Sequence, residues 1–182
     1  VIYNCPMQEF YANRSERTHL PSTPRVVTHH WSTNVRKGFD LYKKFDDFCN
    51  KSGEFEFHYI GQVPRGCSFT NQSSPMAVKD LVTCLPDYDM YLTASEEEAG
   101  ANHVLESLAV GLPVIYKDTG GSIPEYCIHG GLGYSDFSGM IDSLRTVRDE
   151  YPRYKKDCLE YKDTNDMVID KYCDVIRRVH EG

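Results

Sequence analysis

Apolar residues along this chain alternate between two spacings. Short runs of β-branched and aromatic residues predict strands, whereas stretches with an apolar residue every three or four positions predict amphipathic helices. We expect strands at 25–32, 55–60, 90–94 and 113–116, a further short strand at 130–134, and helices at 39–49, 76–85, 104–109, 123–128, 140–147 and 168–179. This alternation predicts an α/β fold: a Rossmann-like, doubly wound, mainly parallel sheet with helices on both faces. Its ligand site is expected at the carboxyl ends of the strands.

The same pattern divides the chain into three parts. Residues 1–24 hold several prolines and no sustained period, which predicts a linker or a wrapped arm. Residues 25–162 contain the strand and helix alternation and are expected to form a single domain. Residues 163–182 carry a one-sided apolar stripe, so we expect a C-terminal helix that packs on that domain. A length of 182 residues suits one ordinary domain with its own core.

Charge and composition exclude several classes of function. There are 27 acidic and 20 basic residues, for a net charge of −7, and no dense Lys/Arg stripe, so nucleic acid is not an expected partner. No run of 18 apolar residues occurs, and no transmembrane span is expected. The seven cysteines form no CxxC motif or Cys/His cluster, which predicts neither a metal site nor a disulfide framework.

The cysteines and the first residues bear on location. Free thiols suit a reducing compartment, and no basic-then-apolar leader is present, so a cytoplasmic location is expected. Because the sequence begins at Val1 without methionine, we expect it to be a piece of a longer chain.

The loop after the first predicted strand combines hydroxyl and basic residues. Ser32 and its neighbours are followed by Arg36, Lys37 and Gly38 immediately before a helix. Hydroxyls, a helix N-terminus and a mobile cation together are suited to binding phosphate. The motif is neither a Walker A loop nor a dinucleotide GxGxxG fingerprint. The alternative is that Lys37 is an ordinary solvent-exposed lysine at a helix start.

Two further loops follow predicted strands. Glu98 and Glu106 flank small residues where a helix should begin, so both carboxylates can face one cleft and accept hydrogen bonds from sugar hydroxyls. An acidic first turn that complements the helix dipole explains the position of Glu98 equally well. The later Gly120-Gly121 pair permits close approach to a ligand or is a structural turn. His29 and His30 could contact an anion or a sugar, although paired histidines in a strand are more often simply packed.

The order of these motifs is more specific than any one of them. The segment from Asp89 to Glu125, DMYLTASEEEAGANHVLESLAVGLPVIYKDTGGSIPE, resembles the donor-domain signature of glycosyltransferase family 4, the retaining GT-B transferases. That signature has two glutamates separated by seven residues, then a Gly-x-Pro-Val segment and a Gly-Gly turn followed by Glu. Upstream, Lys37-Gly38 resembles the Lys-Gly motif of the family, and Val1-Ile2-Tyr3-Asn4 resembles the stretch that follows its acceptor domain.

The resemblance implies a role for each residue of the motifs. Lys37 would contact the donor diphosphate, Glu106 the ribose hydroxyls, and Glu98 the transferred sugar at the catalytic centre. The family usually carries an arginine before the lysine, and here Ser32 or Arg36 would take its place. Backbone N–H groups would complete the cradle, and they come from Ala99, Gly100, Ala101, Asn102 and His103. No metal and no other cofactor is implied, because fixed positive groups stabilise the leaving diphosphate.

At the level of function, the resemblance implies the nucleotide-sugar-binding half of a retaining, hexosyltransferase-like glycosyltransferase. The donor would be a UDP- or GDP-linked sugar. The acceptor would be held by a missing N-terminal domain, so this half alone should bind its donor but hardly catalyse. The alternatives are a non-catalytic nucleotide-binding or interaction module with the same fold and, less favoured because GxGxxG is absent, a nicotinamide-dependent enzyme.

Overall fold

The computed structural model describes residues 4–181, and a six-stranded sheet lies at its centre. The strand order is β3-β2-β1-β4-β5-β6, and every neighbouring pair is parallel. The strands are β1 (Arg25–His30), β2 (Glu56–Gly61), β3 (Asn71–Ser73), β4 (Met90–Thr93), β5 (Val114–Lys117) and β6 (Gly131–Tyr134). The predicted doubly wound, parallel α/β fold is therefore confirmed.

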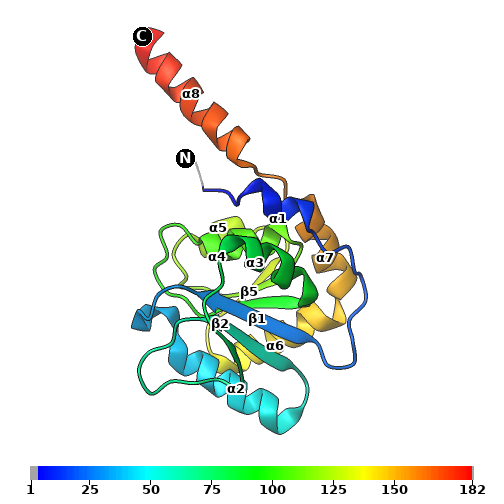
Figure 1. Ribbon diagram of the computed structural model, residues 1–182. Coiled ribbons are helices and arrows are strands. Elements are labelled where there is room, and N and C mark those ends of the chain that lie inside the picture. Colours follow the sequence, from blue (N-terminus) through cyan, green and yellow to red (C-terminus); the bar gives the residue numbers. More distant parts are fainter. Residues whose placement is uncertain (1–3, 182) are drawn as a thin grey trace.

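Helices cover both faces of this sheet (Figure 1). They are α1 (Gln8–Ala12), α2 (Phe39–Ser52), α3 (Val78–Cys84), α4 (Asn102–Ala109), α5 (Ile123–Tyr126), α6 (Phe137–Asp149), α7 (Tyr151–Glu160) and α8 (Asn165–Glu181), with the short 3-10 helices η1 (Val35–Lys37) and η2 (Leu85–Asp87). Helices α2 and α6 pack on one face, and α1, α3, α4 and α5 pack on the other. Helix α7 contributes side chains to both apolar layers.

The period-two arrangement of strand side chains builds these two layers. Val26 of β1 packs in the layer of α2 and α6, whereas Val27 packs in the layer of α4. In β4, Leu92 and Tyr91 divide in the same way. Because both faces are covered, the central strands β1 and β4 are buried at nearly every position, and the polar residues Thr28, His29 and His30 of β1 are buried as well.

The strand order reverses between β1 and β4, where the chain returns to the middle of the sheet. Their ladder joins Val26 to Met90 and Val27 to Tyr91, near the start of each strand. Further along, the Tyr91 hydroxyl accepts a hydrogen bond from the His29 backbone N–H at 3.1 Å and lies 3.4 Å from the His29 carbonyl, to which it donates. A side chain thus replaces the ladder, and the carboxyl ends of the two strands separate to leave a crevice.

The two ends of the chain are arranged differently. The first 24 residues include the short helix α1, whose Phe10 is fully buried. Of the stretch Val1-Ile2-Tyr3-Asn4, for which a similarity was noted, residues 1–3 lie outside the described residues. Helix α8 does not pack on the domain as expected but projects away from it (Figure 1), and its apolar side chains are exposed. The reason is that helices α1–α7 already cover both faces of the sheet.

Helix α7 and strand β3 have no counterpart in the elements expected from the sequence. Pro152 occupies the first turn of α7, where its missing N–H costs no hydrogen bond. Within residues 4–181 no helix is long and apolar enough to cross a membrane.

Candidate functional site

A polar cleft of about 310 Å³ lies over the carboxyl ends of β1 and β4, at the point where the strand order reverses. Its walls come from the end of β1 and the loop that follows it, the loop after β4 and the first two turns of α4. The lining residues are His29, His30, Trp31, Ser32, Lys37, Glu98, Gly100, Asn102, His103 and Glu106. Open doubly wound sheets bind their ligands in this crevice.

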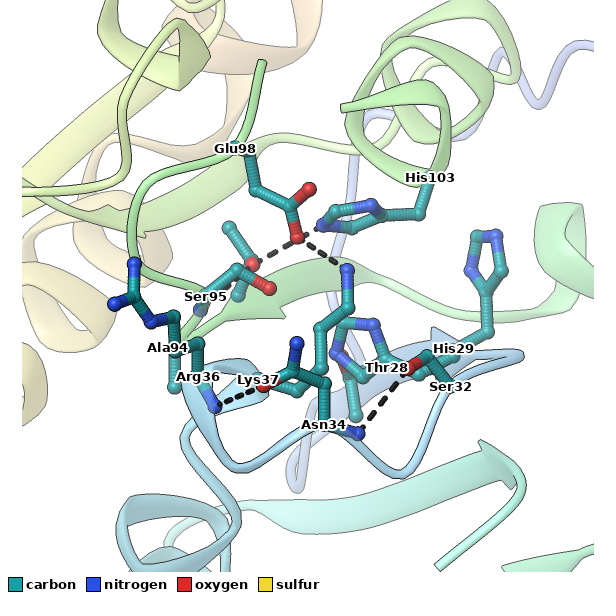
Figure 2. A network of polar contacts seen from close by, with 12 residues as sticks. Thr28, His29, Ser32, Asn34, Arg36, Lys37, Ala94, Ser95, Glu98 and His103 are labelled. Atoms are coloured by element: carbon teal, nitrogen blue, oxygen red, sulfur yellow. Dashed lines mark hydrogen bonds and ion pairs between the residues drawn. The ribbon is translucent and has the colours of Figure 1, made fainter. Parts of the chain in front are cut away.

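The loop after β1 presents Lys37 to the cleft. The Ser32 hydroxyl accepts a hydrogen bond from the Asn34 N–H at 3.1 Å, and the Asn34 side chain caps η1 by accepting from the Arg36 N–H at 3.0 Å (Figure 2). Gly38 then turns the chain into α2 with a φ of +80°. A Cβ on Gly38 would lie 2.5 Å from the Ala94 Cβ, so glycine is required where this loop packs on the end of β4.

Glu98 meets Lys37 across the cleft. The Lys37 ammonium forms an ion pair and hydrogen bond with the Glu98 carboxylate (Figure 2), and the two side chains are 18% and 16% exposed. A largely buried charge requires a partner of opposite sign. In this structure each of these two groups therefore satisfies the other.

The backbone around Glu98 is fixed by the Gly-Gly turn after β5. The Glu98 carbonyl accepts hydrogen bonds from the Ser122 N–H at 2.9 Å and from its hydroxyl at 3.0 Å. Gly121 has a φ of +70°, and a Cβ there would lie 2.4 Å from the Glu98 carbonyl oxygen. Just before Glu98, Glu97 adopts a φ of +56°, a left-handed conformation that is uncommon for a residue other than glycine. The turn thus positions the carboxylate without touching the cleft.

Glu106 is held from the opposite side by a histidine. Helix α4 places Glu106 on its cleft face, where Oε2 lies 2.8 Å from the His29 Nε2. The His29 side chain is only 3% exposed, whereas Glu106 is 18% exposed. One carboxylate oxygen is therefore anchored to the end of β1 while the group still reaches the cleft.

The other two histidines are kept neutral behind these carboxylates. Burial, with smaller effects of Lys37 and His29, lowers the pKa of His30 well below its ordinary value. Burial and the neighbouring His30 do the same to the pKa of His103. His30 Nε2 lies 2.8 Å from the Tyr42 hydroxyl, whose pKa burial raises to about 12, and His103 Nε2 lies 3.2 Å from the Thr93 hydroxyl. Neither ring adds positive charge at neutral pH.

The structure brings most of the predicted site residues together. The predicted residues that line the cleft are Ser32, Lys37, Glu98, Gly100, Asn102, His103 and Glu106. Gly38, Ala99 and Ala101 lie in the same loops without lining it, and Ala101 is buried beneath the start of α4.

Arg36 does not reach the cleft. Its exposed guanidinium pairs instead with Glu97, because η1 directs the side chains of consecutive residues to different sides. Of the described residues that line the cleft, only Lys37 carries a permanent positive charge.

Sequence reasoning gave little weight to two lining residues and none to a third. His29 and His30 sit at the end of β1, where packing was the favoured interpretation, and Trp31 was considered only as the start of its loop. Trp31 is 57% exposed at the cleft and is the single tryptophan of the chain. The one signal in the sequence was that this single tryptophan directly precedes the hydroxyl and basic residues of the loop.

The electrostatics of the cleft suit an anion that also carries hydroxyls. One ammonium and the N-terminus of α4 attract negative charge, and two carboxylates accept hydrogen bonds from hydroxyl groups. Within residues 4–181 no group of three His, Cys, Asp or Glu side chains could hold a metal ion.

Comparison with solved structures places the fold. The chain superimposes on a glycosyltransferase from Rickettsia africae with a TM-score of 0.75 and 14% identity, covering 99% of this chain and 56% of that one. It superimposes on WaaG, a glycosyltransferase involved in lipopolysaccharide biosynthesis, with a TM-score of 0.71 and 16% identity, covering 96% and 55%. For the pneumococcal O-GlcNAc transferase GtfA, in complex with UDP and GlcNAc, the TM-score is 0.69 and the identity 15%, covering 93% and 38%.

At this level of identity the likeness establishes the fold. The chain has the fold of one part of these GT-B glycosyltransferases and spans little more than half of their length or less. No protein-family profile matches the sequence, and no curated protein matches it.

Proposed function

We propose that the cleft binds a nucleoside-diphosphate sugar and that the chain is the donor-binding half of a retaining glycosyltransferase. The observation that carries the proposal is the convergence of Lys37, Glu98 and Glu106 in one cleft at the centre of a GT-B half. These three residues come from two loops and a helix, and Lys37 and Glu106 are 69 positions apart in the sequence. All three nevertheless line the same cleft of about 310 Å³.

Each group has a defined task in this proposal. The Lys37 ammonium and the N-terminal N–H groups of α4 receive the diphosphate. Glu106 accepts hydrogen bonds from the ribose hydroxyls, and Glu98 from hydroxyls of the transferred sugar. As the bond from the anomeric carbon to the diphosphate oxygen breaks, negative charge grows on that oxygen, and Lys37 stabilises it without a metal ion. Transfer with retention would need an acceptor held by a second domain, which closes over the donor.

The proposal extends to the base of the nucleotide. UDP is favoured, because a solved chain of the same fold holds UDP. GDP is the other candidate that the family resemblance leaves open.

A non-catalytic nucleotide-binding or interaction module is the second candidate function. It is favoured by one observation: Arg36 pairs with Glu97 outside the cleft, so the described lining supplies a single permanent cation for two phosphates. Such a module would bind the nucleotide without distinguishing the diphosphate from its sugar conjugate.

Two variants separate the parts of the proposed site. Lys37→Ala should weaken binding of inorganic pyrophosphate and of the nucleoside diphosphate alike, because both present the diphosphate. Glu106→Ala should weaken only the nucleotide, by about 1.5 to 3 kcal/mol, because it removes charged hydrogen bonds to the ribose. Calorimetric titration of both variants tests this. Equal losses for the two ligands in Glu106→Ala would contradict the ribose assignment.

A further inference from the structure

His29 is the buried partner of the carboxylate that lines the cleft on α4. Its Nε2 lies 2.8 Å from Oε2 of Glu106. Within residues 4–181 the structure has no hydrogen bond to the other carboxylate oxygen, Oε1. One oxygen is therefore occupied by the protein, and the other remains available to a ligand.

The chemistry of the pair fixes the direction of the hydrogen bond. A carboxylate only accepts, so the hydrogen must sit on the His29 Nε2. The other ring nitrogen, Nδ1, is buried and has no hydrogen-bond partner among residues 4–181, so a hydrogen placed there would have no acceptor. The pair therefore requires the Nε2–H form of the ring.

The surroundings hold the ring in place. The His29 backbone is clamped by the Tyr91 hydroxyl, and the Tyr91 ring packs edge-on at 5.4 Å between centroids. The His103 ring lies perpendicular to it at 6.2 Å. Because the ring cannot move freely, the hydrogen bond also limits how far Glu106 can turn about its own side-chain bonds.

From this geometry we infer that His29 is a positioning residue that orients Glu106 for the ribose and so sets the preference of the cleft for ribonucleotides over 2′-deoxynucleotides. The inference rests on the proposed function, since it assigns the ribose to Glu106. In this inference His29 acts on the ribose through the Glu106 carboxylate and is assigned no hydrogen bond of its own to the nucleotide. The expected consequence is a loss of ribose discrimination, not of diphosphate binding, when the Nε2–H donor is removed.

The side-chain amides provide matched substitutions. The Gln amide N–H₂ stands where the His Nε2 stands, whereas the Asn amide reaches only as far as Nδ1. His29→Gln should therefore retain the ribose preference. His29→Asn and His29→Phe should both lose it, and His29→Asn keeps the test open if the Phe variant does not fold. His58→Phe is the control, because His58 forms the same kind of pair with Glu56, at 2.9 Å, on β2 and outside the cleft.

The experiment is a titration of the whole chain with three probes, in which binding is measured by the fluorescence of Trp31 or by calorimetry. The probes are UDP or GDP, the matching 2′-deoxynucleoside diphosphate, and inorganic pyrophosphate. Wild type and the Gln and His58 variants should prefer the ribonucleotide at least about tenfold, a factor expected for charged hydrogen bonds. The Asn and Phe variants should fall to within about threefold, with pyrophosphate affinity changed less than about twofold.

A double-mutant cycle separates positioning from a structural role. In a Glu106→Ala background, His29→Asn should change no affinity, because the carboxylate it orients is gone. A further loss in that background, or a parallel loss of pyrophosphate binding, would overturn the inference, as would a full ribose preference in the Asn variant. If wild type binds pyrophosphate but no nucleotide, or binds nothing, the proposed function fails first and the inference falls with it.

Discussion

The ion pair between Lys37 and Glu98 makes a counterintuitive prediction about diphosphate binding. In this structure the Lys37 ammonium is paired with the Glu98 carboxylate, so a diphosphate that uses Lys37 must displace Glu98 and then lie beside its negative charge. Glu98→Gln removes the competing anion while keeping the size of the side chain. We expect this variant to bind inorganic pyrophosphate and the nucleoside diphosphate more tightly than wild type.

The magnitude follows from the burial of the pair. Exposed ion pairs contribute about 0.2 to 1 kcal/mol, and breaking a buried pair costs about 3 to 5 kcal/mol. Lys37 and Glu98 are 18% and 16% exposed, which places them between these cases. We therefore expect that displacing Glu98 from Lys37 costs about 1 to 2 kcal/mol in wild type. Glu98→Gln removes this cost, which corresponds to a gain in diphosphate affinity of roughly five- to thirtyfold.

Glu97→Gln provides the matched control for the assay. It makes the same change in net charge one residue away, but Glu97 is 66% exposed and pairs with Arg36 outside the cleft. Calorimetric titration with pyrophosphate should show less than about a twofold change for this control. An affinity of Glu98→Gln equal to or below that of wild type, in a folded variant, would refute the reasoning that Lys37 binds the diphosphate.

Three other predictions concern the surrounding framework. Gly121→Ala should unfold at a lower temperature and bind pyrophosphate less tightly than Gly66→Ala, because a Cβ at Gly121 meets the Glu98 backbone whereas one at Gly66, with a similar positive φ of +83°, meets nothing within 4 Å. Equal effects of the two substitutions in thermal melts and titrations would argue against the clash. Burial lowers the pKa of Lys155 to about 8, so between about pH 8 and 10.5 the Lys155 side chain binds more protons in the unfolded chain than in the folded one, and the stability of wild type relative to Lys155→Met should rise across that window by up to about 3 kcal/mol. Urea unfolding at several pH values measures this difference in stability, and a difference that does not change with pH would contradict the prediction. Lys37→Arg should bind pyrophosphate less tightly than wild type, because a planar guanidinium places its charge differently, and titration showing unchanged affinity would mean that the site accepts either cation.

The sheet could be predicted from the sequence because its strands are buried on both faces. Val26-Val27, Met90-Tyr91-Leu92 and Val114-Ile115-Tyr116 are short apolar or aromatic runs, and the helices between the strands carry clear apolar stripes. Strand β3 was not predictable in this way, since Asn71-Gln72-Ser73 contains no apolar residue. It holds its edge position through the backbone ladder with β2 and a hydrogen bond from the Asn71 side-chain amide to the Phe57 carbonyl at 3.0 Å. Helix α7 was not predicted. Pro152 is a residue that usually interrupts a helix, although proline is tolerated in the first turn, where it lies here.

Within the cleft, the position of a residue could be predicted where it follows from the strand before its loop, but not where it depends on a contact with a residue distant in the sequence. Lys37 and Glu98 lie in the connections that follow β1 and β4, so the end of the sheet at which they lie could be deduced, and the structure pairs them. The pairing of His29 with Glu106 joins residues 77 positions apart, and no local spacing indicates it. The direction of Arg36 depends on the three-residue helix η1, which the sequence did not predict.

The central claim is that the cleft over β1 and β4 binds a nucleoside diphosphate. The most direct measurement is calorimetric titration of the chain with UDP, GDP, ADP and dTDP, then with the sugar conjugate of the base that binds. The account predicts selective binding of UDP or GDP, lost in Lys37→Ala. A folded chain that binds none of the four at millimolar concentration, or binds all four equally with Lys37→Ala unchanged, would contradict it.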